Sequence, residues 1–466
     1  MKLSKIKYIH FIGIGGVGMV GIAELLLNQG YKISGSDLSE SKNTLRLKKL
    51  GATIKIGHTK ENIKKADVVV FSSAVNKTNP EIIEAKKQGI TLIPRAEMLA
   101  SIMRGFQSIA VAGSHGKTTT TSLIAHIFTE AELDPTYIIG GRILGMEDKS
   151  ILGSSDYIVV EADESDASFL HLNPEISVLT NIDNDHLDFY ENNPKKISDT
   201  FLKFLEKLPF FGVGIICTDD PKSKKLYQKL SRRKISFGFE RTSDFSIKNY
   251  KQTKTHQEFM LKDNIKNFEF DIKLKIPGKH NALNATAAFI VAQQAGIKTN
   301  VIKNSLKNFS GVSRRFEEKG TVQINGKEVL VVDDYGHHPT EIKSTIQAAK
   351  SKYKGRPINM IFQPHRYSRS SILFKEFISV LSDTDSVQLM DIYSAGEANK
   401  SGISSYDFVD SLLRKNIDAK YAKNLNQIRK NLNESIKKDS ILIIQGAGNV
   451  SDITASLMAI GKNEKS

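Results

Sequence analysis

Short apolar runs alternate with longer amphipathic segments along the chain. Runs such as YIHFIGI, VVVFSS and TLIP have the length of buried strands. Segments such as IAELLLNQG and SLIAHIF instead carry apolar residues with helical spacing. Strands that alternate with helices in this way predict an α/β fold built on mostly parallel sheets.

The pattern divides into three blocks, each typical of one domain. We predict an N-terminal Rossmann-like domain over residues 1–106 and a central P-loop ATPase-type domain with a parallel or mixed sheet over 107–311. A C-terminal Rossmann-like α/β domain is predicted over 312–466. A chain of 466 residues has the length expected of about three domains.

The segment VAGSHGKTTTT ends an apolar strand and opens a helix. Only two residues separate Gly113 from Gly116, so the usual G-x-x-x-x-G-K-[ST] spacing is not met literally. The mechanics of a phosphate loop still hold, because glycine amides and a helix N-terminus attract an anion. Lys117 would neutralise terminal phosphates, and Thr118 would offer its hydroxyl to Mg²⁺. The alternative is a Ser/Thr-capped helix after an ordinary glycine turn, but we expect a nucleoside triphosphate.

A second glycine turn, GIGGVG, follows the first strand. Gly13, Gly15 and Gly18 match G-x-G-x-x-G, and Asp37 ends the next strand, near where a ribose would lie. The pattern is typical of a nicotinamide or flavin cofactor. The same turn can bind any diphosphate, or only pack a helix closely on a sheet.

Acidic residues and a histidine follow two further apolar strands. Glu161 ends the run IVV, and Asp163, Glu164 and Asp166 come directly after it. Carboxylates at a strand end beside a phosphate loop suit Mg²⁺, although an acidic surface loop has the same composition. His186 follows the strand VLT and is either a core or surface histidine or part of the same sheet edge.

Two polar groups lie in the last part of the second block and at its boundary with the third. His280, Asn281 and Asn284 occupy the first turns of an alanine-rich helix, where they would either cap the helix or hold a base or phosphate. Arg314 and Arg315 adjoin the domain boundary, where a guanidinium would either reach a phosphate or remain solvated.

The third block carries its own polar strand ends. Clusters follow the strands VLVV and INMIF, and they comprise Asp333, Asp334, Tyr335, His337 and His338 in the first and His365, Arg366 and Arg369 in the second. They indicate a site at the carboxyl edge of another parallel sheet, with a metal site as an alternative. The later run QGAGNV resembles either a second anion loop or a tight turn.

Composition narrows the class of protein. The formal net charge of +15 is compatible with nucleic acid, an anionic membrane or phosphorylated small molecules. The lysines are scattered, which favours a solvated surface and no nucleic-acid partner. The single cysteine, Cys217, excludes an intramolecular disulfide and a cysteine metal cage. No apolar run is long enough to span a bilayer, so a cytoplasmic protein without a membrane partner is expected. No heptad or repeat specifies the oligomeric state; we expect a monomer or a weak homodimer.

Taken together, these motifs resemble the Mur ligases over nearly the whole chain. The strings that carry the resemblance occur in this order: GIGGVGMVGIAE, GSDLSES, VAGSHGKTTTT, EADESDASFLHL, NIDNDHLDFY, PGKHNALNATAA, SGVSRRFE, VDDYGHHPTE, QPHRYSR, DIYSAGE and QGAGNV. Several of them are specific to the members that add L-alanine or to their nearest relatives.

The resemblance implies roles for the residues in these strings. ATP would be bound by Gly113, Ser114, His115, Gly116, Lys117, Thr118, Thr119, His280, Asn281, Asn284, Arg315, Asp334 and Tyr335. Magnesium would be bound by Thr118, Glu161 and His186. UDP-N-acetylmuramate and L-alanine would be bound by Gly13, Gly15, Gly16, Gly18, Asp37, His337, His365, Arg366 and Arg369. The residues implied in catalysis are Lys117, His186, Arg315, His337 and His365.

The resemblance also implies the reaction: an ATP-dependent ligation of L-alanine to the lactyl carboxylate of UDP-N-acetylmuramate, through an acyl phosphate. Either His186 or a C-terminal histidine would take the amine proton. Three alternatives remain. The nearest is a recycling ligase that joins a whole tripeptide to the same nucleotide sugar. A nicotinamide-dependent dehydrogenase would leave the second loop without a role, and a nucleic-acid-dependent ATPase depends on net charge and the phosphate loop.

Overall fold

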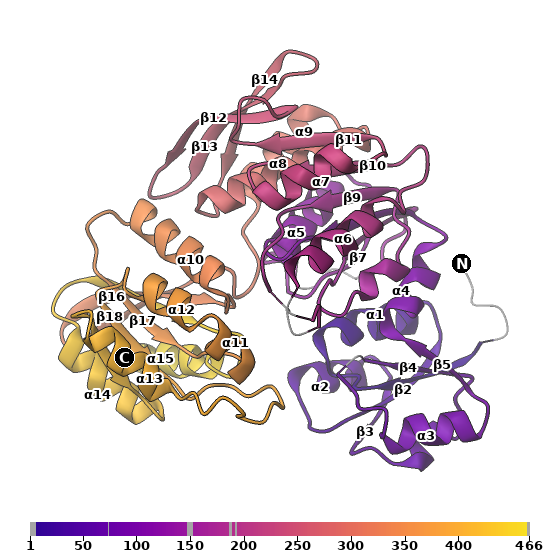
Figure 1. The fold of residues 1–466 in the computed structure, drawn as a ribbon, viewed down its shortest axis with the longest axis horizontal. Coiled ribbons are helices and arrows are strands. Elements are labelled where there is room, and N and C mark those ends of the chain that lie inside the picture. The colour runs from indigo at the N-terminus through magenta and orange to yellow at the C-terminus, as the bar shows by residue number, and fades with distance from the viewer. Residues whose placement is uncertain (1–5, 73, 147–151, 186–188, 192, 464–466) are drawn as a thin grey trace. The chain divides into compact units, whose positions relative to one another are not determined.

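The computed structural model describes residues 6–72, 74–146, 152–185, 189–191 and 193–463. Figure 1 shows the predicted α/β fold, with helices packed on mostly parallel sheets. The chain forms two compact units. The first holds residues 1–248, 260–272 and 283–309, and the second holds 249–259, 273–282 and 310–466. The three domain boundaries given above stay a prediction.

The first sheet has the strand order β3-β2-β1-β4-β5, and every strand pair in it is parallel. Because β1 pairs with both β2 and β4, the turn after β1 lies where the strand order reverses, the usual ligand position in such sheets. The elements are β1 (Tyr8–Ile12), α1 (Val17–Asn28), β2 (Lys32–Asp37), α2 (Lys42–Lys49), β3 (Thr53–Ile56), the 3₁₀ helix η1 (Lys60–Ile63), β4 (Val68–Phe71), α3 (Pro80–Lys87), β5 (Thr91–Pro94) and α4 (Arg95–Met103).

The second sheet has the order β14-β13-β12-β11-β10-β9-β6-β8-β7. Here β6 lies between β8 and β9 and is parallel to both, so the loop after β6 again lies at a reversal of strand order. The strands are β6 (Gln107–Ala112), β7 (Thr136–Ile138), β8 (Tyr157–Glu161), β9 (Ile176–Leu179), β10 (Val213–Cys217), β11 (Lys234–Gly238), β12 (Phe245–Gln252), β13 (Gln257–Asp263) and β14 (Phe268–Leu274). The helices are α5 (Lys117–Glu130), η2 (Ser168–His171), α6 (Pro194–Leu205), α7 (Pro221–Lys229), α8 (Lys279–Gln294) and α9 (Thr299–Asn308).

The third sheet has the order β15-β16-β20-β17-β18-β19, with β15 antiparallel to β16 and the remaining pairs parallel. The strands are β15 (Glu317–Ile324), β16 (Lys327–Asp334), β17 (Ile358–Phe362), β18 (Ser386–Leu389), β19 (Asp418–Tyr421) and β20 (Ser440–Gln445). The helices are α10 (Pro339–Lys352), α11 (Tyr367–Ile372), α12 (Phe374–Leu381), α13 (Ser405–Leu413), α14 (Leu425–Ser435) and α15 (Ser451–Asn463).

Local signals explain where many helices begin. The side chains of Asn79, Asn193 and Asp220 each accept a hydrogen bond from an amide in the first turn of their helix, and a proline follows each of them. Ser41 and Thr44 form a capping box at α2. The helix of the phosphate loop differs, because α5 begins after Gly116 in the left-handed conformation and has no side-chain cap.

A shared apolar core joins the first sheet to the second within the first unit. It includes Phe11 from β1, Leu99 and Ile102 from α4, and Phe169 and Phe201 from the second sheet's layer of helices. Helix α4 therefore packs against both parts of this unit. The third sheet has separate cores on its two sides.

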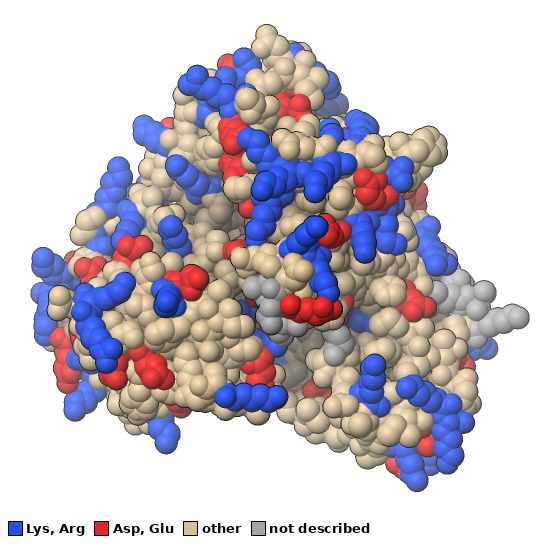
Figure 2. Space-filling model, viewed as in Figure 1, with Lys and Arg blue, Asp and Glu red and all other residues tan. Residues whose placement is uncertain are grey.

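The surface matches the scattered charge of the sequence. Figure 2 shows lysine and arginine side chains interspersed with acidic ones over the face in view. Within the described residues, no helix is both long and apolar enough to cross a membrane. The thiol of Cys217 is buried, and this burial raises its pKa to about 12.

A buried carboxylate ties the first sheet to its helices. Glu81, in the first turn of α3, is fully buried and accepts hydrogen bonds of 2.6 Å from Ser36 Oγ and from Asn62 Nδ2. His10 Nε2 lies 3.2 Å from the same carboxylate. Burial alone would raise the pKa of Glu81, but the hydrogen bonds from these three side chains outweigh it and lower the pKa.

We therefore expect Glu81→Gln to destabilise the protein by about 1–3 kcal/mol at pH 7, because the amide cannot accept all three hydrogen bonds. Since the folded-state pKa lies below the ordinary value of 4.5, this contribution is complete above that pH and is lost as the pH falls through the folded value. Urea unfolding of both chains between pH 7 and pH 3 checks this. A difference in stability that stays constant over that range would contradict it.

Candidate active site

The glycine turn after β1 is held by β2. Gly13 adopts φ +78°, and its amide donates to Ser36 O at 2.8 Å. Gly15 donates its amide to Asp37 Oδ2 at 2.8 Å, and a Cβ on Gly15 would lie 2.9 Å from that oxygen. Gly16 is the N-cap residue of α1. The predicted nucleotide-sugar residues Gly13, Gly15, Gly16, Gly18 and Asp37 thus lie together at one turn.

The phosphate loop after β6 is braced by the residues after β9. Its amides at Ser114 and His115 donate to Asn181, at 3.1 Å to the backbone oxygen and 2.9 Å to the side-chain oxygen. Thr180 Oγ1 donates to His115 O at 2.6 Å. A Cβ on Gly113, at φ +130°, would lie 2.1 Å from Thr180 Oγ1, so only glycine fits there.

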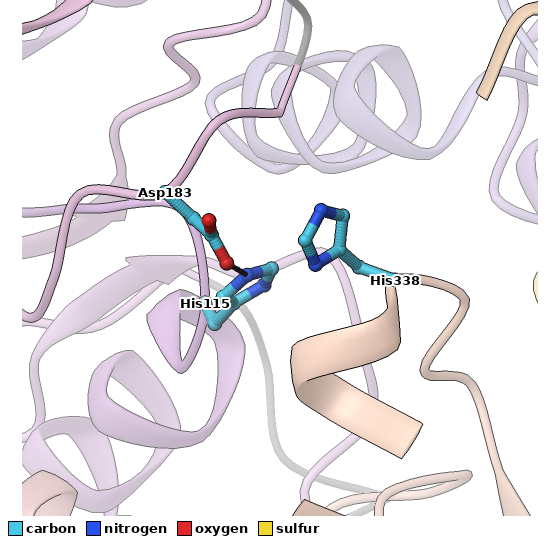
Figure 3. Close-up of side chains that lie close together, drawn as sticks. All are labelled: His115, Asp183 and His338. Carbon is cyan, nitrogen blue, oxygen red and sulfur yellow. Dashed lines mark hydrogen bonds and ion pairs between the residues drawn. The ribbon is translucent and has the colours of Figure 1, made fainter. Parts of the chain in front are cut away.

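The histidine of the loop is paired with an acid from the same neighbouring segment. His115 Nε2 lies 3.0 Å from Asp183 Oδ2, as Figure 3 shows. The amide of Asp183 donates to Ser114 Oγ at 2.8 Å, which ties the segment to the loop a second time. His338, also drawn in Figure 3, belongs to the second unit, where its ring accepts from Thr340 N and caps α10.

Lys117 is enclosed by its own loop and by a carboxylate. Its Nζ donates to Gly113 O at 2.6 Å and to both carboxylate oxygens of Glu164 at 2.8 Å. Burial alone would lower the pKa of Lys117, but the carboxylates of Glu164 and Asp163 outweigh it and raise the pKa. The ammonium group therefore stays charged at the loop, where it can attract a terminal phosphate.

The predicted magnesium residues are only partly described. Glu161 ends β8 in register with Val111 of β6, so its carboxylate lies at the sheet edge from which the phosphate loop leaves. Thr118 is in the first turn of α5. Hydroxyl and carboxylate oxygens are ligands that suit Mg²⁺. His186 lies outside the described residues.

The alanine-rich helix α8 provides one residue to the phosphate loop. A Cβ on Gly116 would lie 2.6 Å from Asn284 Oδ1, so this amide abuts the loop. Asn281 Nδ2 instead donates to Pro277 O at 2.7 Å, at the helix start. Burial lowers the pKa of His280 to about 4, which leaves its ring neutral at pH 7.

In the second unit, the paired arginines meet the end of β16. Both guanidinium groups lie over the Tyr335 ring, at 5.2 Å for Arg314 and 5.1 Å for Arg315. Arg315 Nη1 is also 3.4 Å from Glu341 Oε1. Asp334 accepts hydrogen bonds from the Phe316 and Gly336 amides, and burial raises its pKa to about 6. Arg315, Asp334 and Tyr335 therefore lie together, as the motifs predict.

The two histidines predicted near the substrate are brought together. The rings of His337 and His365 are 5.2 Å apart, and His365 stacks on Tyr393 at 5.5 Å. Arg369 is buried, with Nη1 3.4 Å from His365 Nδ1. Arg366 forms an ion pair with Glu397. The cluster combines aromatic faces with cations, a combination that can hold a carboxylate or an amine.

The side chain of Gln363 fills the space at the glycine turn of QGAGNV. Gln363 Oε1 accepts from Val450 N at 3.1 Å, and a Cβ on Gly448 would lie 2.4 Å from that oxygen. Of the two alternatives for this run, the contacts favour a tight turn packed on Gln363.

Four of the predicted ATP- and substrate-binding side chains pair with an acid that the motifs do not identify as their partner. The acids are Glu164 for Lys117, Asp183 for His115, Glu341 for Arg315 and Glu397 for Arg366. A signal existed for Asp183 and Asn181, because both follow a strand that neighbours β6. The same signal existed for Glu164, which follows β8, the other neighbour of β6. Glu341 and Glu397 are brought in by tertiary packing.

We expect Lys117→Met to slow ATP turnover by about 100- to 1000-fold, because it removes a preorganised cation and leaves Glu164 facing the phosphates. Glu164→Gln should not weaken ATP binding, because the phosphates of ATP then no longer compete with a carboxylate for Lys117. Titration with ATP and steady-state phosphate release measure both effects. If Glu164→Gln were as damaging as Lys117→Met, Glu164 would have a role of its own beyond pairing the lysine.

Sequence models of three Mur ligase domains match the chain in consecutive order. Residues 8–107 match the model described as "Mur ligase family, catalytic domain", residues 111–292 the "Mur ligase middle domain", and residues 314–448 the "Mur ligase, glutamate ligase domain". Together they span most of the chain.

Solved structures of similar fold agree with these matches. The UDP-N-acetylmuramate–alanine ligase MurC from Thermotoga maritima has a TM-score of 0.83 and 27% identity, covering 98% of this chain and 100% of that one. The murein peptide ligase from Psychrobacter arcticus has a TM-score of 0.72 and 23% identity, covering 98% and 99%.

A third similar structure is a partial match. The UDP-N-acetylmuramate:L-alanyl-γ-D-glutamyl-meso-diaminopimelate ligase from Neisseria meningitidis has a TM-score of 0.60 and 25% identity, covering 66% of this chain and 100% of that one. The three consecutive domain matches and the full-length similarity together establish that this chain belongs to the Mur ligase family, whose members are ATP-dependent ligases of peptidoglycan precursor synthesis.

Proposed function

We propose that the protein joins L-alanine to the lactyl carboxylate of UDP-N-acetylmuramate at the expense of ATP. The observation that carries this proposal is the full-length similarity to the Thermotoga maritima alanine ligase, at a TM-score of 0.83. The strings QPHRYSR and DIYSAGE support the same substrate. They contain His365 and Arg369, which contact each other in the second unit.

The proposed reaction has two steps. The muramoyl carboxylate first attacks the γ-phosphoryl group of ATP, which gives an acyl phosphate and ADP. The amine of L-alanine then attacks the acyl carbon, and phosphate leaves as the amide forms. Negative charge develops on the phosphoryl oxygens in the first step and on the acyl oxygen of the tetrahedral intermediate in the second. Cations held in fixed positions would therefore lower both barriers.

Roles follow for the residues of the phosphate loop. Lys117 would bind the terminal phosphates, since it is already held charged at the loop by Glu164. The amides of the loop would bind the β-phosphate, and Asn284 would order the turn at Gly116. Thr118, Glu161 and His186 would hold Mg²⁺, which supplies further neutralisation of phosphate charge when bound.

Roles also follow in the second unit. Arg315 would act on the transferring phosphoryl group, and Asp334 would fix the backbone beside it through Phe316 N. His337 and His365 would lie against the amino acid and carboxylate, and His280, Asn281 and Tyr335 would bind nucleotide. His186 or one of these two histidines would take the amine proton. Arg366 and Arg369 would hold carboxylates.

One second candidate has support. The similar fold of two murein peptide ligases favours a recycling ligase that joins a tripeptide to the same nucleotide sugar. The two candidates share the phosphate loop and the glycine turn after β1, so they differ only in the pocket for the amino acid. Membership of the family supports the diphosphate alternative for GIGGVG over a nicotinamide cofactor.

Purified protein with ATP, Mg²⁺, UDP-N-acetylmuramate and L-alanine tests the proposal, with the tripeptide in place of L-alanine as the second arm. We expect phosphate release that requires both the nucleotide sugar and L-alanine, and a product heavier by one alanyl residue. Phosphate assay and mass spectrometry measure the two quantities.

Other outcomes assign the protein differently. Joining of the tripeptide alone would establish the recycling ligase instead. ATP hydrolysis that requires neither substrate would reject both ligases, and stimulation of that hydrolysis by nucleic acid with a steep salt dependence would favour the ATPase alternative.

A further inference from the structure

An arginine that no motif singled out lies across the glycine turn of the first sheet. Arg95 is the first residue of α4, and a Cβ on Gly18 would lie 2.9 Å from its Nη1 and 3.2 Å from its Cδ and Cζ. Gly18 is the third glycine of G-x-G-x-x-G and lies in the first turn of α1. The guanidinium therefore packs on the N-terminus of the helix that would face a diphosphate.

The position of Arg95 does not serve its own helix. A cation at a helix N-terminus is disfavoured by the helix dipole. The side chain is only 15% exposed, so its charge is largely removed from bulk water. Because both the helix dipole and burial disfavour the charge of Arg95 here, the guanidinium needs an anionic partner.

The protein supplies only one such partner among the described residues. Arg95 Nη2 donates to Asp163 Oδ2 at 3.2 Å, and this is the single hydrogen bond of a group with five N–H donors. That distance is long for a charge-assisted hydrogen bond. For comparison, Arg46 Nη2 in the same sheet layer lies 2.6 Å from Glu24 Oε1.

The first turn of α1 holds no acidic residue, and Gly16 caps the helix without a side-chain hydrogen bond. The carboxylate of Asp37 accepts from Gly15 N, the residue before this cap. Helix N-terminus and guanidinium thus present two positive groups side by side, an arrangement suited to a diphosphate.

We infer that Arg95 binds the diphosphate of the nucleotide sugar and that Asp163 is only its ion-pair partner within the protein. The inference rests on the proposed function, which supplies the substrate. It also links the two substrate loops physically, because Asp163 precedes Glu164, the partner of Lys117. Two consecutive carboxylates therefore hold one cation at each loop.

The competing explanation is that the Arg95–Asp163 pair only fastens α4 to the second sheet. The two explanations predict different effects for changes of the two partners. If the pair only holds α4 in place, changing either partner should reduce affinity for the nucleotide sugar equally. If Arg95 binds the diphosphate, only a change of the arginine should reduce that affinity. The decisive comparison is therefore between Arg95→Gln and Asp163→Asn, with Arg46→Gln as the control for loss of an arginine ion pair in the same domain.

Calorimetric titration of the full chain with UDP-N-acetylmuramate, in the presence of a non-hydrolysable ATP analogue and Mg²⁺, gives the affinities. We expect Arg95→Gln to weaken binding about 10- to 100-fold, as for loss of hydrogen bonds to a charged group. Asp163→Asn should weaken it less than about threefold, and the double variant should match Arg95→Gln. The KM for the nucleotide sugar should rise with kcat little changed, and affinity for ATP should not change.

Several results would overturn the inference. These are equal losses of affinity in Arg95→Gln and Asp163→Asn, or a loss in Arg95→Gln no larger than in Arg46→Gln. If Arg95→Gln does not fold, Arg95→Lys retains the charge without the planar fork, and an unchanged affinity in that variant would count against the inference. A wild-type chain that binds ATP but not UDP-N-acetylmuramate would reject the proposed function itself. Normal turnover by the wild type with full affinity in Arg95→Gln would reject only the role of Arg95.

Discussion

The phosphate loop depends on the ion pair between Lys117 and Glu164. Both side chains are largely enclosed, at 18% and 5% exposure, so each charge would be costly to keep without the other. Buried ion pairs add little to stability compared with apolar contacts of the same size. The pair lies in the predicted phosphate loop, and perturbed ionisable groups cluster at functional sites. Glu164 keeps Lys117 charged within the loop, and under the proposed function a phosphate would replace this carboxylate.

The same arrangement recurs at the other candidate cations. Arg315 pairs with Glu341, Arg366 with Glu397 and Arg95 with Asp163. Under the proposed function, a substrate oxyanion would replace each carboxylate or bind beside it. Exchange of one anion for another alters the charge around the cation less than binding at a bare cation would.

The sequence predicts which residues lie at the ends of strands, but it does not predict which of these residues contact one another. The fold class followed from alternating strands and helices, and the two glycine turns were placed by their strand and helix neighbours. His337 and His365 were expected at one edge because both follow parallel strands, yet β20 lies between those strands, and only side-chain reach brings the two rings together. Asn284 reaches Gly116 across a long stretch of chain. Such contacts depend on tertiary packing, which leaves no periodic signal in the sequence.

Backbone conformation, and not only side-chain choice, sets the direction of Arg315. Its neighbours Arg314 and Phe316 adopt φ +59° and +47°, values that cost roughly 1–3 kcal/mol each for residues other than glycine. The structure holds them there by several bonds: Phe316 N to Asp334, Arg314 Nη2 to Gly446 O at 2.6 Å and Tyr335 N to Arg314 O at 2.7 Å. These contacts join the segment to the ends of β16 and β20. A guanidinium placed by a long flexible side chain alone would sample many positions, whereas this one starts from a backbone fixed on two strands. Under the proposed function, this fixed backbone would preorganise the cation of Arg315.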